Sequence, residues 1–155
     1  MTEWKYLNSV AFKTRYVVAA SFLTGCKRIV EIGSYKTPIY DFMDDTFREF
    51  VIYEIKDGVP FEKCPGIKDY GLVILGLDLE SVDESEVWKL VENSRVAVLE
   101  TAVEYFNGRT QLERVLLNTS KKVVFRCVFD FEGNDYGDLT GSAVLLVKRL
   151  MVVLE

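Results

Sequence analysis

The chain contains no histidine among its 155 residues. This absence removes the usual general base near neutral pH, the Ser-His-Asp triad and every histidine-ligated metal site. Cysteine is scarce as well, and Cys26, Cys64 and Cys127 are widely spaced and odd in number. That spacing indicates neither a disulfide framework nor a CxxC metal site, so free thiols and no metal are expected. Any chemistry must therefore come from carboxylates, lysine, tyrosine, thiols or the positioning of a reactive cofactor.

Basic side chains and long apolar runs are also in short supply. The 19 Lys and Arg residues against 24 Asp and Glu give a net charge of -5, which argues against binding to the polyanionic backbone of nucleic acid. No stretch of about 18 apolar residues could span a bilayer, and the amino terminus lacks the layout of a signal peptide. We expect a cytoplasmic protein with no membrane association, whose partner is a small molecule or a protein. The oligomeric state is left open, with a homodimer as one option.

Hydrophobic periodicity divides the chain into alternating strands and helices. With 49% hydrophobic residues and no repeat or linker, we expect a single domain over residues 1–155. A capping box, Ser81-Val82-Asp83-Glu84, predicts the start of a helix that runs to about residue 93. The other expected elements are helices over 4–24, 38–49 and within 110–118, and strands over 29–32, 50–55, 72–77, 95–100, 122–131 and 143–153.

The order of these elements predicts the architecture. Strands alternate with helices, and two long strands then follow each other as a closing antiparallel pair. We therefore predict an α/β protein, a three-layer Rossmann-like sandwich whose central sheet is mostly parallel with an antiparallel C-terminal strand. Residues 56–70 contain Asp57-Gly58, Val59-Pro60 and Pro65-Gly66 and are too broken by turn formers for a helix, a strand and a helix. This predicts a shortened edge of the sheet.

The first expected helix carries its apolar residues on one face, but with an interruption. Trp4, Leu7, Ala11, Val18 and Phe22 recur with a period of 3.6, which is typical of an amphipathic helix. Arg15 falls on that same face and weakens the pattern.

Two acids at the ends of the first two strands are the strongest functional signal. The run Arg28-Ile29-Val30-Glu31-Ile32-Gly33 ends in an acid and a glycine, and Glu54 ends the next strand 21 residues after Gly33. A strand, an acid, a glycine, a helical stretch and a second strand that ends in an acid are typical of a nucleotide-binding βαβ unit. The sequence thus predicts a nucleoside ligand.

Over nearly the whole chain, this order of elements and these strand ends resemble the class I S-adenosylmethionine-dependent methyltransferases. The first loop reads Glu31-Ile32-Gly33-Ser34-Tyr35-Lys36, with one glycine where that family usually has two or three. The resemblance implies that S-adenosylmethionine is the cofactor and that Gly33 and Ser34 lie in the loop beneath its methionine part. It further implies that Glu31 steadies this loop or binds the cofactor ammonium, and that Lys36 meets the cofactor carboxylate. Glu54 would accept hydrogen bonds from both ribose hydroxyls, because a vicinal diol offers two donors to two carboxylate oxygens.

The methyl acceptor would lie at the carboxyl ends of the central strands, where the sequence places Gly76, Asp78 and Glu100-Thr101. Asp78 is the candidate catalytic base, needed only where the acceptor must lose a proton. Structural alternatives stay open: Asp78 as the start of the connection to the capping box, Glu54 as an acid in water, and Lys36 as an exposed loop lysine. Glu31 has its own alternatives, which are capping a nearby helix or pairing with Arg28 or Lys36.

Two classes of function follow from these residues. The first is a small methyltransferase that acts on a small-molecule or protein acceptor, favoured by Glu31, Gly33 and Glu54. The second is a catalytically degenerate Rossmann-like module that binds a nucleoside or a partner protein. The single loop glycine and the shortened edge favour the second class.

Overall fold

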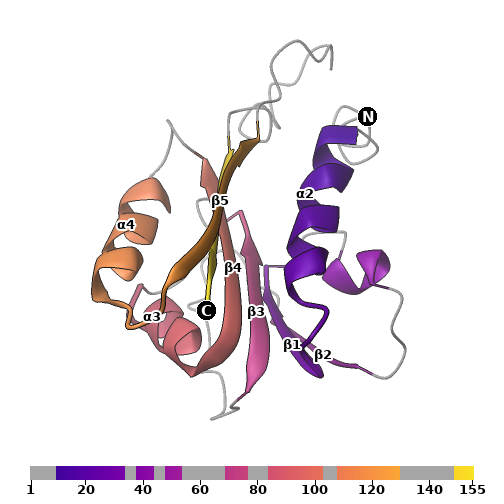
Figure 1. Cartoon of the computed structure of the whole chain (residues 1–155), viewed down its shortest axis with the longest axis horizontal. Coiled ribbons are helices and arrows are strands. Elements are labelled where there is room, and N and C mark those ends of the chain that lie inside the picture. The colour runs from indigo at the N-terminus through magenta and orange to yellow at the C-terminus, as the bar shows by residue number, and fades with distance from the viewer. Residues whose placement is uncertain are drawn as a thin grey trace.

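A six-stranded sheet forms the centre of the protein in the computed structural model, which describes residues 10–33, 38–43, 48–53, 69–76, 84–102, 108–129 and 149–155. The strands are β1 (Arg28–Ile32), β2 (Glu49–Tyr53), β3 (Tyr70–Leu75), β4 (Ser94–Ala102), β5 (Val123–Phe129) and β6 (Arg149–Leu154). They lie in the order β2-β1-β3-β4-β6-β5 (Figure 1). Strands β2, β1, β3 and β4 run parallel to one another, and β6 runs antiparallel to both β4 and β5. The predicted mostly parallel sheet with an antiparallel C-terminal strand is confirmed.

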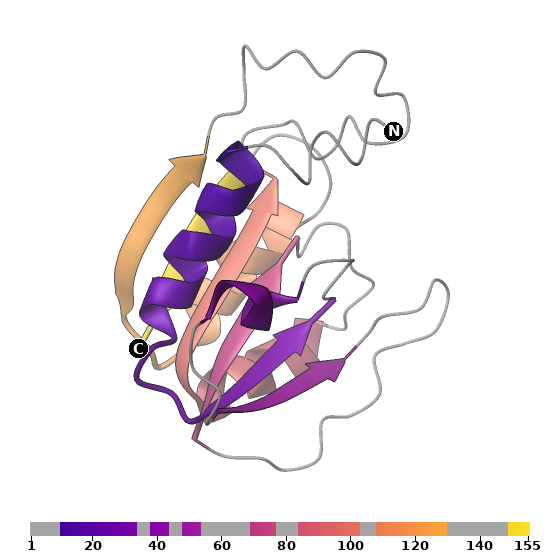
Figure 2. The same cartoon turned by 90° about the vertical axis from the view of Figure 1, so that its right-hand side faces the viewer.

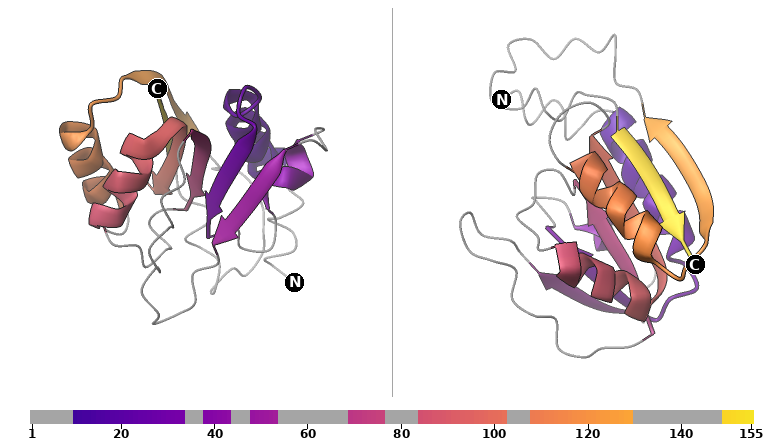
Figure 3. Two further views of the ribbon diagram at one scale, coloured as in Figure 1. Left: turned by 90° about the horizontal axis from the view of Figure 1, so that it is seen from below. Right: turned by 90° about the vertical axis from the view of Figure 1, so that its left-hand side faces the viewer.

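Helices cover both faces of the sheet and complete the three layers. The helix α2 (Val10–Phe22) and the 3-10 helix η1 (Ile39–Phe42) lie on one face, which Figure 2 presents to the viewer. The helices α3 (Glu84–Asn93) and α4 (Gly108–Asn118) lie on the other face, seen in front of the sheet in the right-hand view of Figure 3. Because the central strands are buried on both faces, they read as continuous apolar runs rather than as alternating patterns.

The buried face of α2 differs from the predicted one. Tyr16, Ala19, Ala20 and Leu23 point into the core, and Val18 and Phe22 lie at its margin. The predicted face was thus displaced around the helix, whereas Arg15, which the sequence placed among its apolar residues, is buried as that placement implies. Trp4 and Leu7, and the side chain of Ala11, lie outside the described residues.

The helix predicted over residues 38–49 was wrong. Among the described residues of this range, only the four of η1 are helical, and Met43 is already extended, with φ -121° and ψ 127°. Tertiary packing outweighs the local helix signals here, because Ile39 is fully buried and the ring of Phe42 stacks on Tyr16 with a 4.7 Å separation between centroids. Arg48 donates to the carbonyl of Leu23 at 2.8 Å, which ties the chain before β2 to the end of α2.

The remaining boundaries shift by a few residues. Strand β3 begins at residue 70 rather than 72, and the Tyr70 hydroxyl donates to the Leu90 carbonyl of α3 at 2.7 Å. The predicted shortened edge, residues 56–70, lies almost entirely outside the described residues and stays a prediction, as does the single domain. Cys26 and Cys127 are free thiols. Among the described helices, none combines the length and the apolar character that crossing a membrane requires.

Candidate functional site

Two neighbouring parallel strands end in glycines with left-handed backbone conformations. Gly33 directly follows β1 with φ 96°, and Gly76 directly follows β3 with φ 89°. The Gly76 N–H donates to the Glu100 carbonyl of β4 at 3.2 Å. Residues with a side chain rarely adopt this conformation, so glycine is what lets both chains leave the sheet here. The carboxyl ends of β1, β3 and β4 form the edge at which open α/β sheets bind ligands.

Glu31 lies at this edge with a buried side chain, on the face covered by α2 and η1. It is only 3% exposed, and its Oε1 accepts the N–H of Ile39, the first residue of η1, at 2.9 Å. The pKa of Glu31 is raised to about 7, mainly by burial; the Ile39 hydrogen bond lowers it, and the nearby Asp41 contributes a smaller rise. Of the structural roles considered for Glu31, the structure shows the capping of a nearby helix.

Arg28, a possible partner of Glu31, is engaged elsewhere. Its Nε donates to Glu49 Oε2 at 3.0 Å, near the amino end of the parallel strands. Of the predicted cofactor residues, the structure describes Glu31 and Gly33, which lie two positions apart at the end of β1.

The other predicted site residues, Ser34, Lys36, Glu54 and Asp78, lie outside the described residues, so their roles stay predictions. The backbone next to Glu54 is described. Tyr53, the residue before Glu54, pairs with Ile32, the residue before Gly33.

The most unexpected feature at this edge is a buried cluster of Arg15, Glu100 and Arg149. Arg15 comes from α2, Glu100 from β4 and Arg149 from β6, and their exposed fractions are 4%, 0% and 0%. Arg15 Nε donates to Glu100 Oε2 at 2.7 Å, and Arg149 Nε donates to Glu100 Oε1. Burial by itself raises the pKa of Glu100, but the charges and hydrogen bonds of Arg149 and Arg15 outweigh it, so the pKa is lowered.

This cluster has a chemical consequence for the strand ends. Both oxygens of Glu100 accept from arginines and its pKa is low, so Glu100 is a poor proton acceptor at neutral pH. It instead ties α2 to the sheet. Sequence reasoning noted Arg15 and Glu100 separately and missed Arg149. The cluster could have been suspected from the sequence, because each of the three residues is a charge that interrupts an otherwise apolar segment.

Thr101, next to Glu100, points to the opposite face of the sheet. Its side chain is fully buried, and its hydroxyl is the one buried side-chain polar atom without a hydrogen-bond partner among the described residues. We assign this hydroxyl no function.

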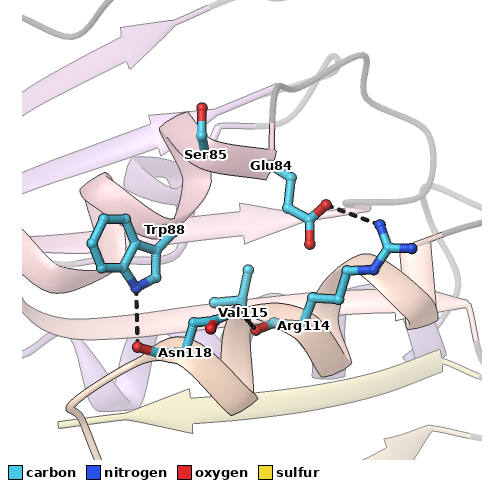
Figure 4. Close-up of a pocket in the computed structure, with 6 residues that line it drawn as sticks. All are labelled: Glu84, Ser85, Trp88, Arg114, Val115 and Asn118. Carbon is cyan, nitrogen blue, oxygen red and sulfur yellow. Dashed lines mark hydrogen bonds and ion pairs between the residues drawn. The ribbon is translucent and has the colours of Figure 1, made fainter.

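A pocket of about 580 Å³ lies between α3 and α4, away from the strand ends (Figure 4). At one end, the Trp88 indole N–H donates to the Asn118 carbonyl at 3.2 Å. At the other end, Arg114 pairs with Glu84 at 3.1 Å, and Val115 lies between the two contacts. Its walls are two helices rather than strand ends, so it is separate from the site at Glu31 and Gly33.

No protein-family model and no curated protein matches the chain. Solved structures do match it. A SAM-dependent methyltransferase from Archaeoglobus fulgidus has a TM-score of 0.52 at 12% identity, over 92% of this chain and 91% of that chain. The plantazolicin methyltransferase BpumL in complex with SAH has a TM-score of 0.58 at 9% identity, over 99% of this chain and 88% of that chain.

A third match is a chain in the structure of the Pnkp1/Rnl/Hen1 RNA repair complex. Its TM-score is 0.58 at 12% identity, over 94% of this chain and 42% of that chain. The protein thus spans less than half the length of that chain. Identities this low establish architecture alone, and the protein has the α/β fold found in SAM-dependent methyltransferases.

Proposed function

We propose that the protein binds S-adenosylmethionine and transfers its methyl group to a small-molecule or protein acceptor. The observation that carries this proposal is the end of β1, where a buried acid, Glu31, and a left-handed glycine, Gly33, lie together at the ligand-binding edge of the sheet. The fold supports it, because two of the matching structures are SAM-dependent methyltransferases or bind SAH.

The residues at this edge fit the chemical groups of the cofactor. Gly33 lacks a Cβ, so the loop after β1 can approach a ligand closely. Glu31 supplies a carboxyl group to the ammonium, and Lys36 supplies a cation to the cofactor carboxylate, with Ser34 in the same loop. Glu54 would accept hydrogen bonds from the two ribose hydroxyls.

S-Adenosylmethionine supplies a methyl group that carries its own sulfonium leaving group. The contribution of the protein is then to hold the acceptor atom in line with that methyl group and to exclude water. Asp78 would take the proton of an acceptor that must lose one. Glu100 does not compete for this role, because two arginines hold its carboxylate.

Calorimetric titration with S-adenosylmethionine and S-adenosylhomocysteine tests the proposal. Glu54→Ala and Gly33→Trp should abolish binding, because one removes the ribose acceptor and the other fills the loop. Glu49→Ala is the matched control: it removes an acid from the amino end of β2, where Glu49 pairs with Arg28, whereas Glu54 follows the last residue of β2 in the sequence. Binding retained by the control and lost in both site variants supports the proposal, and no binding at millimolar ligand contradicts it.

A second candidate function is a non-catalytic module that binds a nucleoside or a partner protein. Glu100 favours this second function. It is an acid at the carboxyl end of β4, but it is ion-paired with arginines and its pKa is lowered, so it is unsuited to accept a proton. Thermal-shift measurements against NAD, ATP and guanine nucleotides distinguish the two functions, since a bound ligand raises the melting temperature. Stabilisation by one of these nucleotides but not by S-adenosylhomocysteine would favour this second function.

A further inference from the structure

Glu31 is surrounded by apolar side chains on the face of the sheet that it shares with η1. The strand register places Ile52 of β2 and Val73 of β3 on either side of it. Ile29 precedes it on the same face of β1, and Ile39 of η1 belongs to the same buried cluster as Ile29 and Val73. Further along the strand comes Gly33, which has no side chain. Among the described residues, the direction left without a side chain is thus toward the carboxyl ends of the strands, where open α/β sheets bind ligands.

The charged groups on the elements around Glu31 do not neutralise it within the described part of the chain. Asp41 of η1 carries the same sign and opposes its ionisation. Arg15 of α2 bonds to Glu100 of β4. The pair Arg28 and Glu49, from β1 and β2, lies at the amino ends of these strands, and β3 presents the apolar Val73 beside Glu31.

These surroundings favour the neutral form of the carboxyl group, because burial without a counter-ion penalises the charged form. With its pKa raised to about 7, Glu31 holds a proton in about half of the molecules near neutral pH. A neutral carboxyl group balances the charge of an ammonium ion poorly, whereas a carboxylate forms a charge-assisted hydrogen bond with it.

We propose that Glu31 makes this site selective for ligands that carry an ammonium group, and that it releases a proton to solvent when such a ligand binds. The inference rests on the proposed function, in which that ligand is S-adenosylmethionine. The O–H bond of the carboxyl group breaks, the proton passes to water, and the ligand N–H donates to the resulting carboxylate. Charge balances, since one buried cation enters as one proton leaves.

The size of the effect follows from proton linkage. Binding selects the ionised form, so the dissociation constant rises as the pH falls below 7, approaching a factor of about ten per pH unit. Between pH 7.5 and pH 5.5 it should rise about 25-fold. In this range the ligand amine stays mostly protonated, since α-amino groups titrate near about pH 8.

The test is calorimetric titration of S-adenosylhomocysteine at pH 5.5, 6.5 and 7.5 in two buffers with different ionisation enthalpies. The wild type should show the 25-fold change and, near pH 7, the release of about half a proton. Glu31→Gln should bind with no pH dependence and release no proton. Asp41→Asn is the matched control, because it removes the like charge and keeps the carboxyl group, so proton release should persist with its midpoint at lower pH. 5′-Methylthioadenosine, which lacks the ammonium group, should bind without pH dependence.

The outcomes separate this inference from the proposed function. If S-adenosylhomocysteine binds with the same affinity at pH 5.5 and 7.5 and with no buffer-dependent heat, the inference is wrong and the proposed function stands. If it does not bind at any pH, both are wrong. If Glu31→Gln does not fold, carbon-13 titration of the Glu31 carboxyl group in the wild type decides. A pKa that drops when the ligand binds supports the inference, and an unchanged pKa overturns it.

Discussion

Replacing Glu100 by glutamine should destabilise the protein far more than the small change in shape suggests. The substitution leaves Arg15 and Arg149 buried without the carboxylate that both contact. Removing one member of a buried ionic cluster costs about 3–5 kcal/mol, since an uncompensated charge stays out of water. For a chain of 155 residues this corresponds to a fall in melting temperature of about 9–15 °C.

Urea denaturation followed by circular dichroism measures this loss, and the exposed pair of Arg114 and Glu84 supplies the matched control. Those side chains are 59% and 34% exposed, so Glu84→Gln should cost less than about 1 kcal/mol. Replacing the whole cluster by Arg15→Met, Glu100→Leu and Arg149→Met should recover much of the loss, because apolar side chains of similar volume need no counter-charge. A cost for Glu100→Gln no larger than that of the control would refute the reasoning.

The pH dependence of this loss has a definite sign. Because the folded pKa of Glu100 is lowered, the ionised carboxylate stabilises the fold at every pH above the unfolded value of about 4.3. That contribution disappears as the pH falls through the folded pKa. The difference in stability between wild type and Glu100→Gln should thus be equal at pH 7 and pH 5.5 and shrink only below about pH 4.

Three further predictions concern single side chains. Gly71→Ala should cost about 1–3 kcal/mol, because the added Cβ would lie 2.8 Å from Leu23 Cδ2, whereas Gly25→Ala meets nothing within 4 Å and should be nearly neutral in the same urea titration. The folded state favours the protonated form of Glu31, so this residue should lower the stability of the wild type as the pH rises from about 4.3 to 7. At pH 8, Glu31→Gln should therefore be about 1–3 kcal/mol more stable than wild type, and equal stabilities would contradict this. Thr101→Val should stabilise the protein by about 1 kcal/mol, since it removes a buried hydroxyl without a partner, and a lower melting temperature would count against that account.

Much of the fold could be predicted from local patterns. The strands β1, β3 and β4 appear in the sequence as apolar runs between polar segments, because a strand buried on both faces needs apolar side chains at successive positions. The helix predicted to run to about residue 93 is present as α3, which ends at Asn93, and the antiparallel pair at the end of the chain was indicated by two long β-type segments in succession.

Part of the local geometry at the candidate site could also be predicted from the sequence. A strand that ends in an acid and a glycine predicted a ligand-binding loop at Glu31 and Gly33; the left-handed conformation of Gly33 agrees with the need for glycine there, and ligand binding itself stays a prediction. The burial of Glu31 and its hydrogen bond with the Ile39 N–H could not be predicted from the sequence, because they depend on where η1 packs.

By itself, the sequence determined which segments are buried strands and in which order they follow, since that information lies in runs of a few neighbouring residues. Only the tertiary structure decided that Ile39–Phe42 form a short 3-10 helix, because the burial of Ile39 outweighs local helix propensity. It also decided that Arg15 and Arg149, which lie 85 and 49 positions from Glu100, share its carboxylate. Such a contact depends on how three distant segments pack together, and a buried charge becomes stable only after that packing has brought its partners to it.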